Sequence, residues 1–283
     1  MTHTTLIDAA TLRSLLDGPA PPVLIDAGFD LADTGAGERA WAATHLPGAH
    51  YLHLDRDLSG AKDGHNGRHP LPDRRGFARL VGALGIAPGR QAVAYDAQGG
   101  PYAARVWWML RWLGHEAVAV LDGGLAAWRA AGGATTDAPA PPRGASAAPY
   151  PERPSLAGSV DAETLLGRLG RVPLIDARAG ERFRGEVEPL DARAGHIPGA
   201  LNRFFKDNLG PDGRFKPPSQ LRSEFAPLLA DAAPSDVVHQ CGSGVTACHN
   251  LLAMEHAGLA GSLLYPGSWS EWSSDPVRPV ASG

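Results

Sequence analysis

The sequence predicts an α/β protein of two tandem domains, each a mostly parallel sheet flanked by helices. Three observations support this prediction. Short motifs recur at a nearly constant spacing, apolar strand-like segments alternate with helical ones, and a Pro- and Ala-rich stretch separates the two halves. Strands that alternate with helices are typical of parallel sheets joined by right-handed crossovers.

The internal repeat consists of three matches that occur in the same order, about 150 residues apart. They are LIDA at 24–27 and 174–177, HLPGA at 45–49 against HIPGA at 196–200, and Gly123-Gly124 with Trp128 against Gly267-Ser268 with Trp272. A repeat of this length predicts a duplicated structural unit. Residues present in both copies, including Asp26 with Asp176 and His45 with His196, are therefore interpreted as structural.

Each copy shows the same alternation of segments. Short apolar runs predict buried strands, and longer apolar runs predict buried helices. In the first copy the strands are expected at 23–27, 91–95 and 117–121, with a helix at 103–113; in the second, the strands are expected at 173–177, 236–240 and 262–265, with a helix at 245–257. Trp107, Trp108 and Trp112 lie on the first helix, where we expect core and inter-domain packing.

The repeat and the composition together predict the domain organisation. Residues 1–136 would form an N-terminal domain and residues 156–283 a C-terminal domain. The segment between them, 137–155, is rich in Pro, Ala and Ser, which is typical of an extended, semi-rigid linker.

Composition excludes several classes of protein. The 283 residues contain 26 Lys+Arg and 30 Asp+Glu, a formal net charge of -4, which argues against nucleic-acid binding through bulk charge. Apolar runs are too short for a membrane span, and the first residues lack a secretory signal. Two cysteines cannot form a disulfide framework. We therefore expect a cytoplasmic protein without membrane contacts, and a monomer by default.

One site is sharply indicated by the sequence. The expected strand ending at Gln240 leads into Cys241-Gly242-Ser243-Gly244 and then into a helix. Glycines let such a loop curl so that its backbone N–H groups converge on an anion, and the helix N-terminus adds positive potential. That field would favour a thiolate on Cys241, ready to act as a nucleophile and to carry an anionic adduct. The alternative interpretation is an inert, buried thiol.

These motifs resemble those of a known family. The loop CGSGVTA, the paired HLPGA and HIPGA motifs and the segment YPGSWSEW resemble the two-domain rhodanese-like sulfurtransferases, which include the thiosulfate and 3-mercaptopyruvate enzymes. In that family both domains have the rhodanese fold and only the C-terminal one carries the cysteine. The resemblance implies a catalytically silent first domain, because Asp96 follows the strand that ends at Tyr95.

The resemblance also implies a mechanism. Cys241 would take sulfur from a donor as a persulfide and pass it to cyanide, a small thiol or a thioredoxin-like protein. Backbone N–H groups of Gly242, Gly244, Val245 and Thr246 would bind the substrate and the persulfide. No cofactor beyond the persulfide is implied, since no nucleotide-binding fingerprint is present.

The donor is left open by the sequence. Gly242 and Ser243 stand where members that prefer thiosulfate carry basic residues, which favours 3-mercaptopyruvate. In such members the resemblance implies a Ser-His-Asp set, here Ser243, His69 and Asp55. The alternative is that His69 and Asp55 only support their loops.

The resemblance further implies two arginines that hold the donor carboxylate. Arg182 in ERFRGE matches the first, and a guanidinium suits a carboxylate. The second position holds Leu190, and Arg193 and Arg184 are the candidates to replace it. This departure keeps a thiosulfate-specific enzyme as an alternative.

Other functions fit less well. His239, Cys241, Cys248 and His249 lack the paired spacing of a zinc site, so we expect no metal. A disulfide between Cys241 and Cys248 would need Cα atoms closer than a helical segment of that length allows. A cysteine phosphatase would need an arginine near Ala247, and a purely regulatory binding module would have no use for the intact cysteine loop.

Overall fold

The computed structural model describes residues 2–144 and 147–283, and the chain divides into two compact units. The first unit comprises three segments, which are the residues up to Ser59, Pro72–Leu156 and Pro211–Arg214. The second comprises Gly60–Leu71, Ala157–Gly210 and Phe215–Gly283. Residues 145 and 146 of the expected linker lie outside the described residues. The described residues of the 137–155 stretch contain no helix or strand.

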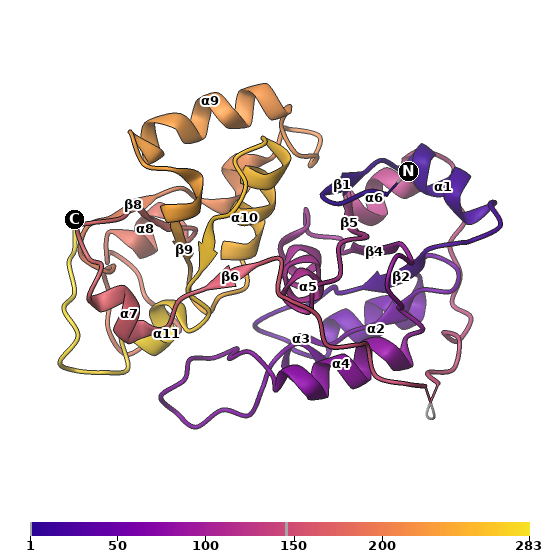
Figure 1. The fold of residues 1–283 in the computed structure, drawn as a ribbon, viewed down its shortest axis with the longest axis horizontal. Coiled ribbons are helices and arrows are strands. Elements are labelled where there is room, and N and C mark those ends of the chain that lie inside the picture. The colour runs from indigo at the N-terminus through magenta and orange to yellow at the C-terminus, as the bar shows by residue number, and fades with distance from the viewer. Residues whose placement is uncertain (1, 145–146) are drawn as a thin grey trace. The chain divides into compact units, whose positions relative to one another are not determined.

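The first unit contains a parallel five-stranded sheet in the order β1-β5-β4-β2-β3 (Figure 1). Its strands are β1 (Leu6–Ile7), β2 (Val23–Asp26), β3 (His50–Tyr51), β4 (Ala92–Tyr95) and β5 (Val118–Leu121). The helices of this unit are α1 (Ala9–Leu16), α2 (Ala36–Ala43), α3 (Leu54–Asp57), α4 (Arg74–Ala83), α5 (Pro101–Trp112) and α6 (Gly124–Ala130). The buried helix α5 packs against β4 and β5, as its apolar sequence predicts.

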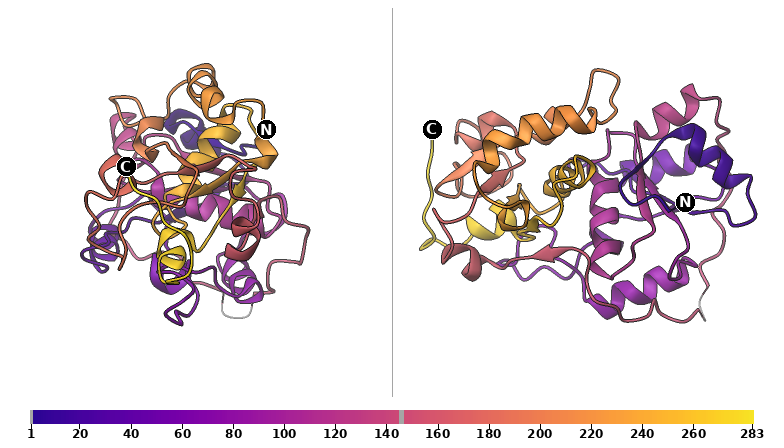
Figure 2. Two further views of the ribbon diagram at one scale, coloured as in Figure 1. Left: turned by 90° about the vertical axis from the view of Figure 1, so that its left-hand side faces the viewer. Right: turned by 45° about the horizontal axis from the view of Figure 1, so that its top comes forward.

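The second unit repeats this topology with the strand order β6-β10-β9-β7-β8. Its strands are β6 (Gly158–Ser159), β7 (Leu174–Asp176), β8 (Ala200–Asn202), β9 (Val238–Gln240) and β10 (Leu263–Leu264). Its helices are α7 (Ala162–Leu166), α8 (Gly180–Phe183), η1 (Phe205–Asn208), α9 (Pro218–Leu229), η2 (Pro234–Asp236), α10 (Ala247–His256) and α11 (Ser268–Trp272). Helices α9 and α10 pack side by side (Figures 1 and 2). Two parallel sheets flanked by helices confirm the predicted fold class.

The predicted central strands and both long helices are present, with ends that differ from the prediction by at most two residues. The outer strands β1, β3, β6 and β8 were not predicted, because two or three residues carry no readable periodicity. Trp107 and Trp108 are each 1 % exposed, which confirms their predicted place in the core. No helix among the described residues has the length and apolar character needed to cross a membrane.

Hydrogen bonds show why residues of the internal repeat recur. Asp26 accepts the N–H of Gly28 at 2.9 Å, and Asp176 accepts that of Arg178 at 2.9 Å. The two repeated histidines match in the same way: His45 bonds through Nδ1 to the Trp41 carbonyl at 2.7 Å and His196 to that of Phe183 at 2.8 Å. These equivalent bonds agree with the structural role that the repeat predicts.

Candidate active site

Cys241 follows β9, the middle strand of the second sheet. Its side chain is buried, with the residue 1 % exposed, and its thiol forms no disulfide. The Cys241 N–H donates to Ser268 Oγ at 3.1 Å, and its carbonyl accepts the N–H of Trp269 at 3.0 Å. The cysteine is therefore fixed by the start of α11, the segment in which the YPGSWSEW motif lies. Because ligands of parallel sheets bind beyond the carboxyl ends of strands, this is the expected place for a reactive group.

The loop after Cys241 is shaped by Gly244. Its φ is +74°, and a Cβ atom added there would lie 2.2 Å from the Pro266 carbonyl oxygen, so only glycine fits without displacement. The loop ends at Thr246, where α10 begins. Within the described residues, the backbone N–H groups of Gly242, Ser243, Val245 and Thr246 have no hydrogen-bond partner. They are available to an anion, next to the positive end of a ten-residue helix.

The second unit also brings His69 to this loop. His69 Nδ1 lies 2.7 Å from Ser243 Oγ, and both residues are buried, at 4 % and 6 % exposure. His69 comes from residues 60–71, which cluster with the second unit although they precede most of the first in the chain. A histidine hydrogen-bonded to a hydroxyl can move a proton through that hydroxyl.

Asp55, the third member of the expected set, belongs to the first unit. It lies in the short helix α3, half-buried, and its N–H donates to His53 Nδ1 at 3.1 Å. The structure thus brings His69 and Ser243 together within one unit, whereas the role expected for Asp55 stays a prediction.

Arg182 lies beside the cysteine loop, on α8. A Cβ atom added to Gly242 would lie 3.4 Å from Arg182 Nη1. The other terminal nitrogen of Arg182, Nη2, donates to Glu188 at 2.7 and 2.9 Å. The side chain is 18 % exposed. Arg182 is therefore held by an ion pair, and one end of its guanidinium faces the loop.

Neither expected replacement for the second arginine reaches the loop. Arg193 donates to the backbone carbonyls of Asp275 and Arg278 at 2.9 and 3.0 Å. Arg184 pairs with Glu186 at 2.8 Å, with both side chains about half exposed. Leu190 is 44 % exposed. Arg193 is bonded to backbone carbonyls and Arg184 to a surface carboxylate. The structure therefore does not support either residue as the second carboxylate-binding arginine.

Sequence reasoning missed Arg68, which does lie at the loop. The added Cβ of Gly242 would lie 2.9 Å from Arg68 Nη2. Arg68 forms an ion pair with Asp191, whose carboxylate also lies 3.4 Å from Arg182 Nη2. The available signal was its position in the motif RHPLP, directly before His69.

His239 and Cys248 also lie near the loop in sequence, but their burial and contacts indicate a structural role. Burial lowers the pKa of His239 to about 3, so this imidazole is neutral at ordinary pH. The buried Cys248 thiol donates to the Gly244 carbonyl at 3.4 Å, and neither cysteine forms a disulfide. Among the described residues, no cluster of three metal-ligating side chains occurs.

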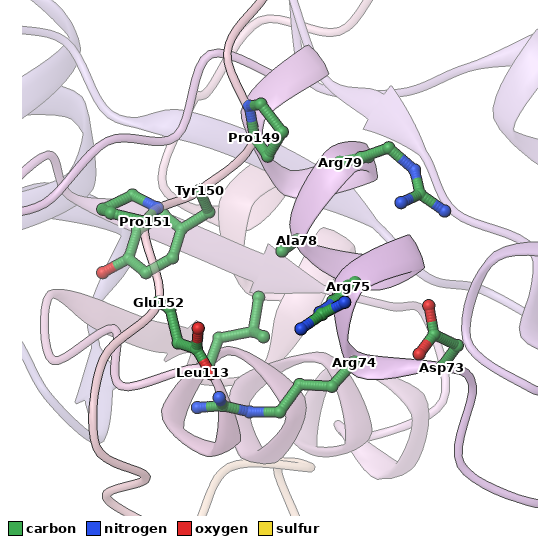
Figure 3. Close-up of a pocket in the computed structure, with 10 residues that line it drawn as sticks. All are labelled: Asp73, Arg74, Arg75, Ala78, Arg79, Leu113, Pro149, Tyr150, Pro151 and Glu152. Atoms are coloured by element: carbon green, nitrogen blue, oxygen red, sulfur yellow. The ribbon is translucent and has the colours of Figure 1, made fainter.

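A separate pocket of about 500 Å³ lies in the first unit between α4 and the chain near Tyr150 (Figure 3). Its polar lining includes Arg74, Arg75, Arg79 and Glu152. Arg74 donates to the carbonyls of Trp112 and Arg153 at 3.0 and 2.7 Å. No residue that lines this pocket belongs to the candidate site.

Comparison with known proteins identifies the class of protein. The model of the rhodanese-like domain matches residues 8–131 and again 161–275, so the chain belongs to the rhodanese-like family. The two matches cover the helices of both units and every strand of the two sheets except β1 and β6.

Individual relatives make the comparison more specific. The chain is 48% identical to the Pseudomonas aeruginosa protein named "Probable 3-mercaptopyruvate sulfurtransferase", over 100% of both chains. It is 36% identical to the thiosulfate sulfurtransferase of Cricetulus griseus, over 97% of this chain and 93% of that one. The crystal structure of SseA from Escherichia coli, described as a 3-mercaptopyruvate sulfotransferase, aligns with a TM-score of 0.75 and 32% identity, over 95% of this chain and 100% of SseA.

Proposed function

We propose that this chain is a sulfurtransferase that carries sulfane sulfur as a persulfide on Cys241. The observation that carries the proposal is the buried, free thiol at the carboxyl end of β9, followed by a loop whose N–H groups are available to an anion. Relatives of full length that are named as sulfurtransferases support the class of activity and imply small-molecule sulfur donors.

The first half-reaction loads the cysteine. The Cys241 thiolate attacks the donor sulfur and forms an S–S bond. With 3-mercaptopyruvate the carbon–sulfur bond breaks, its electron pair stays on carbon, and that carbon takes a proton to give pyruvate. With thiosulfate the S–S bond of the donor breaks and its electron pair leaves with sulfite. His69, acting through Ser243, is the proposed proton source for the first of these donors.

The second half-reaction unloads the cysteine. Cyanide, a small thiol or a thioredoxin-like protein attacks the outer sulfur, and the S–S bond breaks to regenerate the Cys241 thiolate. Between the two steps, the N–H groups of Gly242, Val245 and Thr246, together with that of Gly244, would bind the persulfide anion. Hydrogen bonds aimed at a developing anion in a buried site lower the barrier to its formation.

We favour 3-mercaptopyruvate over thiosulfate as donor. The loop positions Gly242 and Ser243 carry no charge, and the hydrogen bond between Ser243 and His69 offers a proton that thiosulfate does not need. A thiosulfate-specific enzyme is the alternative, since relatives carry both names.

The first unit is proposed to be catalytically silent, because Asp96 follows β4 where Cys241 follows β9. No cofactor beyond the persulfide is proposed. We also propose a cytoplasmic monomer without nucleic-acid partners. Two cysteines without a disulfide support the cytoplasm, and the net charge of -4 argues against nucleic-acid binding.

The proposal is tested by measuring thiocyanate formed from cyanide, with 3-mercaptopyruvate and thiosulfate as donors at matched concentrations. Mass spectrometry after donor treatment should find one added sulfur atom on Cys241. The Cys241→Ser variant should lose both signals and stay folded, whereas Cys248→Ser, which changes the other buried thiol, should keep both. Full activity in Cys241→Ser would rule out the mechanism.

A further inference from the structure

The segment that carries Arg68 is fixed against the cysteine loop by its backbone. Gly67 has a φ of +84°, and a Cβ atom added there would lie 2.9 Å from the Gly267 carbonyl oxygen. The Arg68 N–H donates to Ser270 Oγ at 3.0 Å, and the Ser270 N–H donates to the Gly242 carbonyl at 2.9 Å. Arg68 is therefore tied to Gly242, the residue after the cysteine, through a single intervening serine.

Two guanidinium groups converge on Gly242. The nitrogen atoms nearest to it are Arg68 Nη2 and Arg182 Nη1. Within residues 2–144 and 147–283, neither of these atoms has a hydrogen-bond partner, and the Nε atoms of both arginines are buried without one. Buried donors without partners, here the two Nε atoms, are uncommon in folded proteins, and the two terminal nitrogen atoms beside Gly242 are available to an acceptor.

Asp191 indicates which acceptor fits. One of its carboxylate oxygens pairs with Arg68, and the other lies 3.4 Å from Arg182 Nη2. A single carboxylate therefore contacts one nitrogen atom of each guanidinium group. Asp191 leaves Arg68 Nη2 and Arg182 Nη1, the nitrogen atoms nearest to Gly242, available to a second carboxylate.

We infer that Arg68 is the second guanidinium of the donor site, and that Arg68 and Arg182 together bind the carboxylate of a 3-thio-2-oxo acid beside Cys241. This inference rests on the proposed function and names its substrate class. Arginine suits the task because its planar fork presents parallel N–H donors to a carboxylate. The role that the sequence leaves vacant at Leu190 is thus filled from the segment that also supplies His69.

The test compares Arg68→Ala and Arg68→Lys with the wild-type chain. We measure KM and kcat for 3-mercaptopyruvate and thiosulfate, and pyruvate binding by calorimetry. Pyruvate has the same carboxylate without the sulfur. Arg68→Ala should raise KM for 3-mercaptopyruvate by about ten-fold or more and weaken pyruvate to the same degree, since a hydrogen bond to a charged group contributes about 1.5–3 kcal/mol. The KM for thiosulfate and both kcat values should change by less than about three-fold.

Arg68→Lys should recover only part of the loss, because an ammonium lacks the fork. Arg184→Ala, which removes an exposed arginine paired with Glu186, is the matched control and should leave all values unchanged. The double variant Arg68→Ala/Asp191→Asn removes the unpaired carboxylate that the single variant leaves. Full recovery in the double variant would mean that Arg68 only neutralises Asp191 and would overturn the inference.

Other outcomes separate this inference from the proposed function. Unchanged pyruvate binding in Arg68→Ala, or equal losses for both donors, overturns the carboxylate role while sulfur transfer stands. A wild-type chain that transfers sulfur from thiosulfate and binds no pyruvate also overturns it. A wild-type chain that is inactive with both donors and binds no pyruvate overturns both proposals.

Discussion

Asp96 occupies in the first unit the position that Cys241 occupies in the second. Each residue follows the middle strand of its sheet, β4 or β9. The Asp96 carbonyl accepts the N–H of Leu125 at 3.2 Å, and the Cys241 carbonyl accepts that of Trp269 at 3.0 Å. The difference lies in the loop that follows. The Asp96 carboxylate accepts four backbone N–H groups of its own loop and of α5, from Gln98, Gly100, Tyr102 and Ala103, at 2.8 to 3.0 Å.

This geometry agrees with the proposal that the first unit is catalytically silent. The loop of the first unit already contains an acceptor attached to its own chain, where the loop of the second has N–H groups available. Burial raises the pKa of Asp96, and the four N–H bonds oppose that shift. The same kind of loop thus holds a carboxylate in one unit and, by our proposal, a persulfide in the other.

Asp96→Ala should destabilise the first unit without affecting sulfur transfer per folded molecule. Four N–H groups, two of them in buried hydrogen bonds, would lose their acceptor, at a cost of about 2 kcal/mol or more. Asp96→Asn should cost less, since its amide oxygen keeps part of the bonding. Urea unfolding and the thiocyanate assay measure the two effects. The control is Asp30→Ala, an exposed carboxylate that also accepts loop N–H groups in the same unit. Loss of transfer in folded Asp96→Ala would contradict a silent first unit.

The bond between His69 and Ser243 leads to a donor-dependent prediction. Ser243→Ala and His69→Gln should each slow turnover of 3-mercaptopyruvate by about 100-fold, the usual size of a general acid–base contribution, and should leave thiosulfate nearly unaffected. Only the first donor releases a carbon that must be protonated. The double variant should be no slower than either single variant if the two residues act as a unit. Equal effects on both donors, or multiplicative losses, would refute the proton path.

The sequence made the cysteine loop predictable because its signals are local. An apolar strand, a glycine-containing turn and a helix follow one another within residues 236–257, and the physics of that turn does not depend on the rest of the chain. Arg68 and Asp191 could not be paired in advance, since they lie far apart in sequence and meet only through folding. For the same reason, the sequence does not predict which groups the guanidinium groups of Arg184 and Arg193 contact.

Asp26 and Asp176 end equivalent strands, yet their substitution by asparagine should change the free energy of unfolding at pH 7 in opposite directions. Burial raises the pKa of Asp26 from 3.8 to about 6, and no arginine follows it, because Gly28 stands where Arg178 stands in the other copy. The protonated Asp26 side chain contributes its full stabilisation below about pH 4, and this contribution is lost as the pH rises through about 6. Asp26→Asn should therefore stabilise the chain at pH 7, relative to pH 4, by up to about 3 kcal/mol.

Asp176→Asn should instead destabilise the chain at pH 7. Asp176 Oδ2 lies 2.7 Å from Arg178 Nη2, and the two side chains are 0% and 1% exposed. Removing the Asp176 charge leaves Arg178 with only its longer ion pair, to Glu188 at 3.5 Å, at a cost of about 3 kcal/mol. Urea unfolding of both variants at pH 4 and pH 7 checks the pair of predictions. The same sign for both variants at pH 7 would show that Arg178 does not set the difference.

Gly244 provides a test of how far sulfur transfer depends on the shape of the cysteine loop. In Gly244→Ala the new Cβ would lie 2.2 Å from the Pro266 carbonyl oxygen. Pro266 leads into Ser268, the acceptor of the Cys241 N–H, so relief of this clash must move the cysteine relative to its loop. A displacement of about 1 Å at a reacting group can cost about 100-fold in rate, and we expect a loss of that size with both donors.

Gly199→Ala is the matched control for the strain itself. Gly199 lies in the same unit and has a φ of +79°, yet an added Cβ would have no atom within 4 Å. It should cost about 1 kcal/mol of stability for the left-handed conformation and leave the rate of transfer unchanged. If Gly244→Ala keeps full activity, the loop does not fix the sulfur. If Gly199→Ala loses as much activity as Gly244→Ala, general loss of stability rather than displacement of Cys241 is the cause.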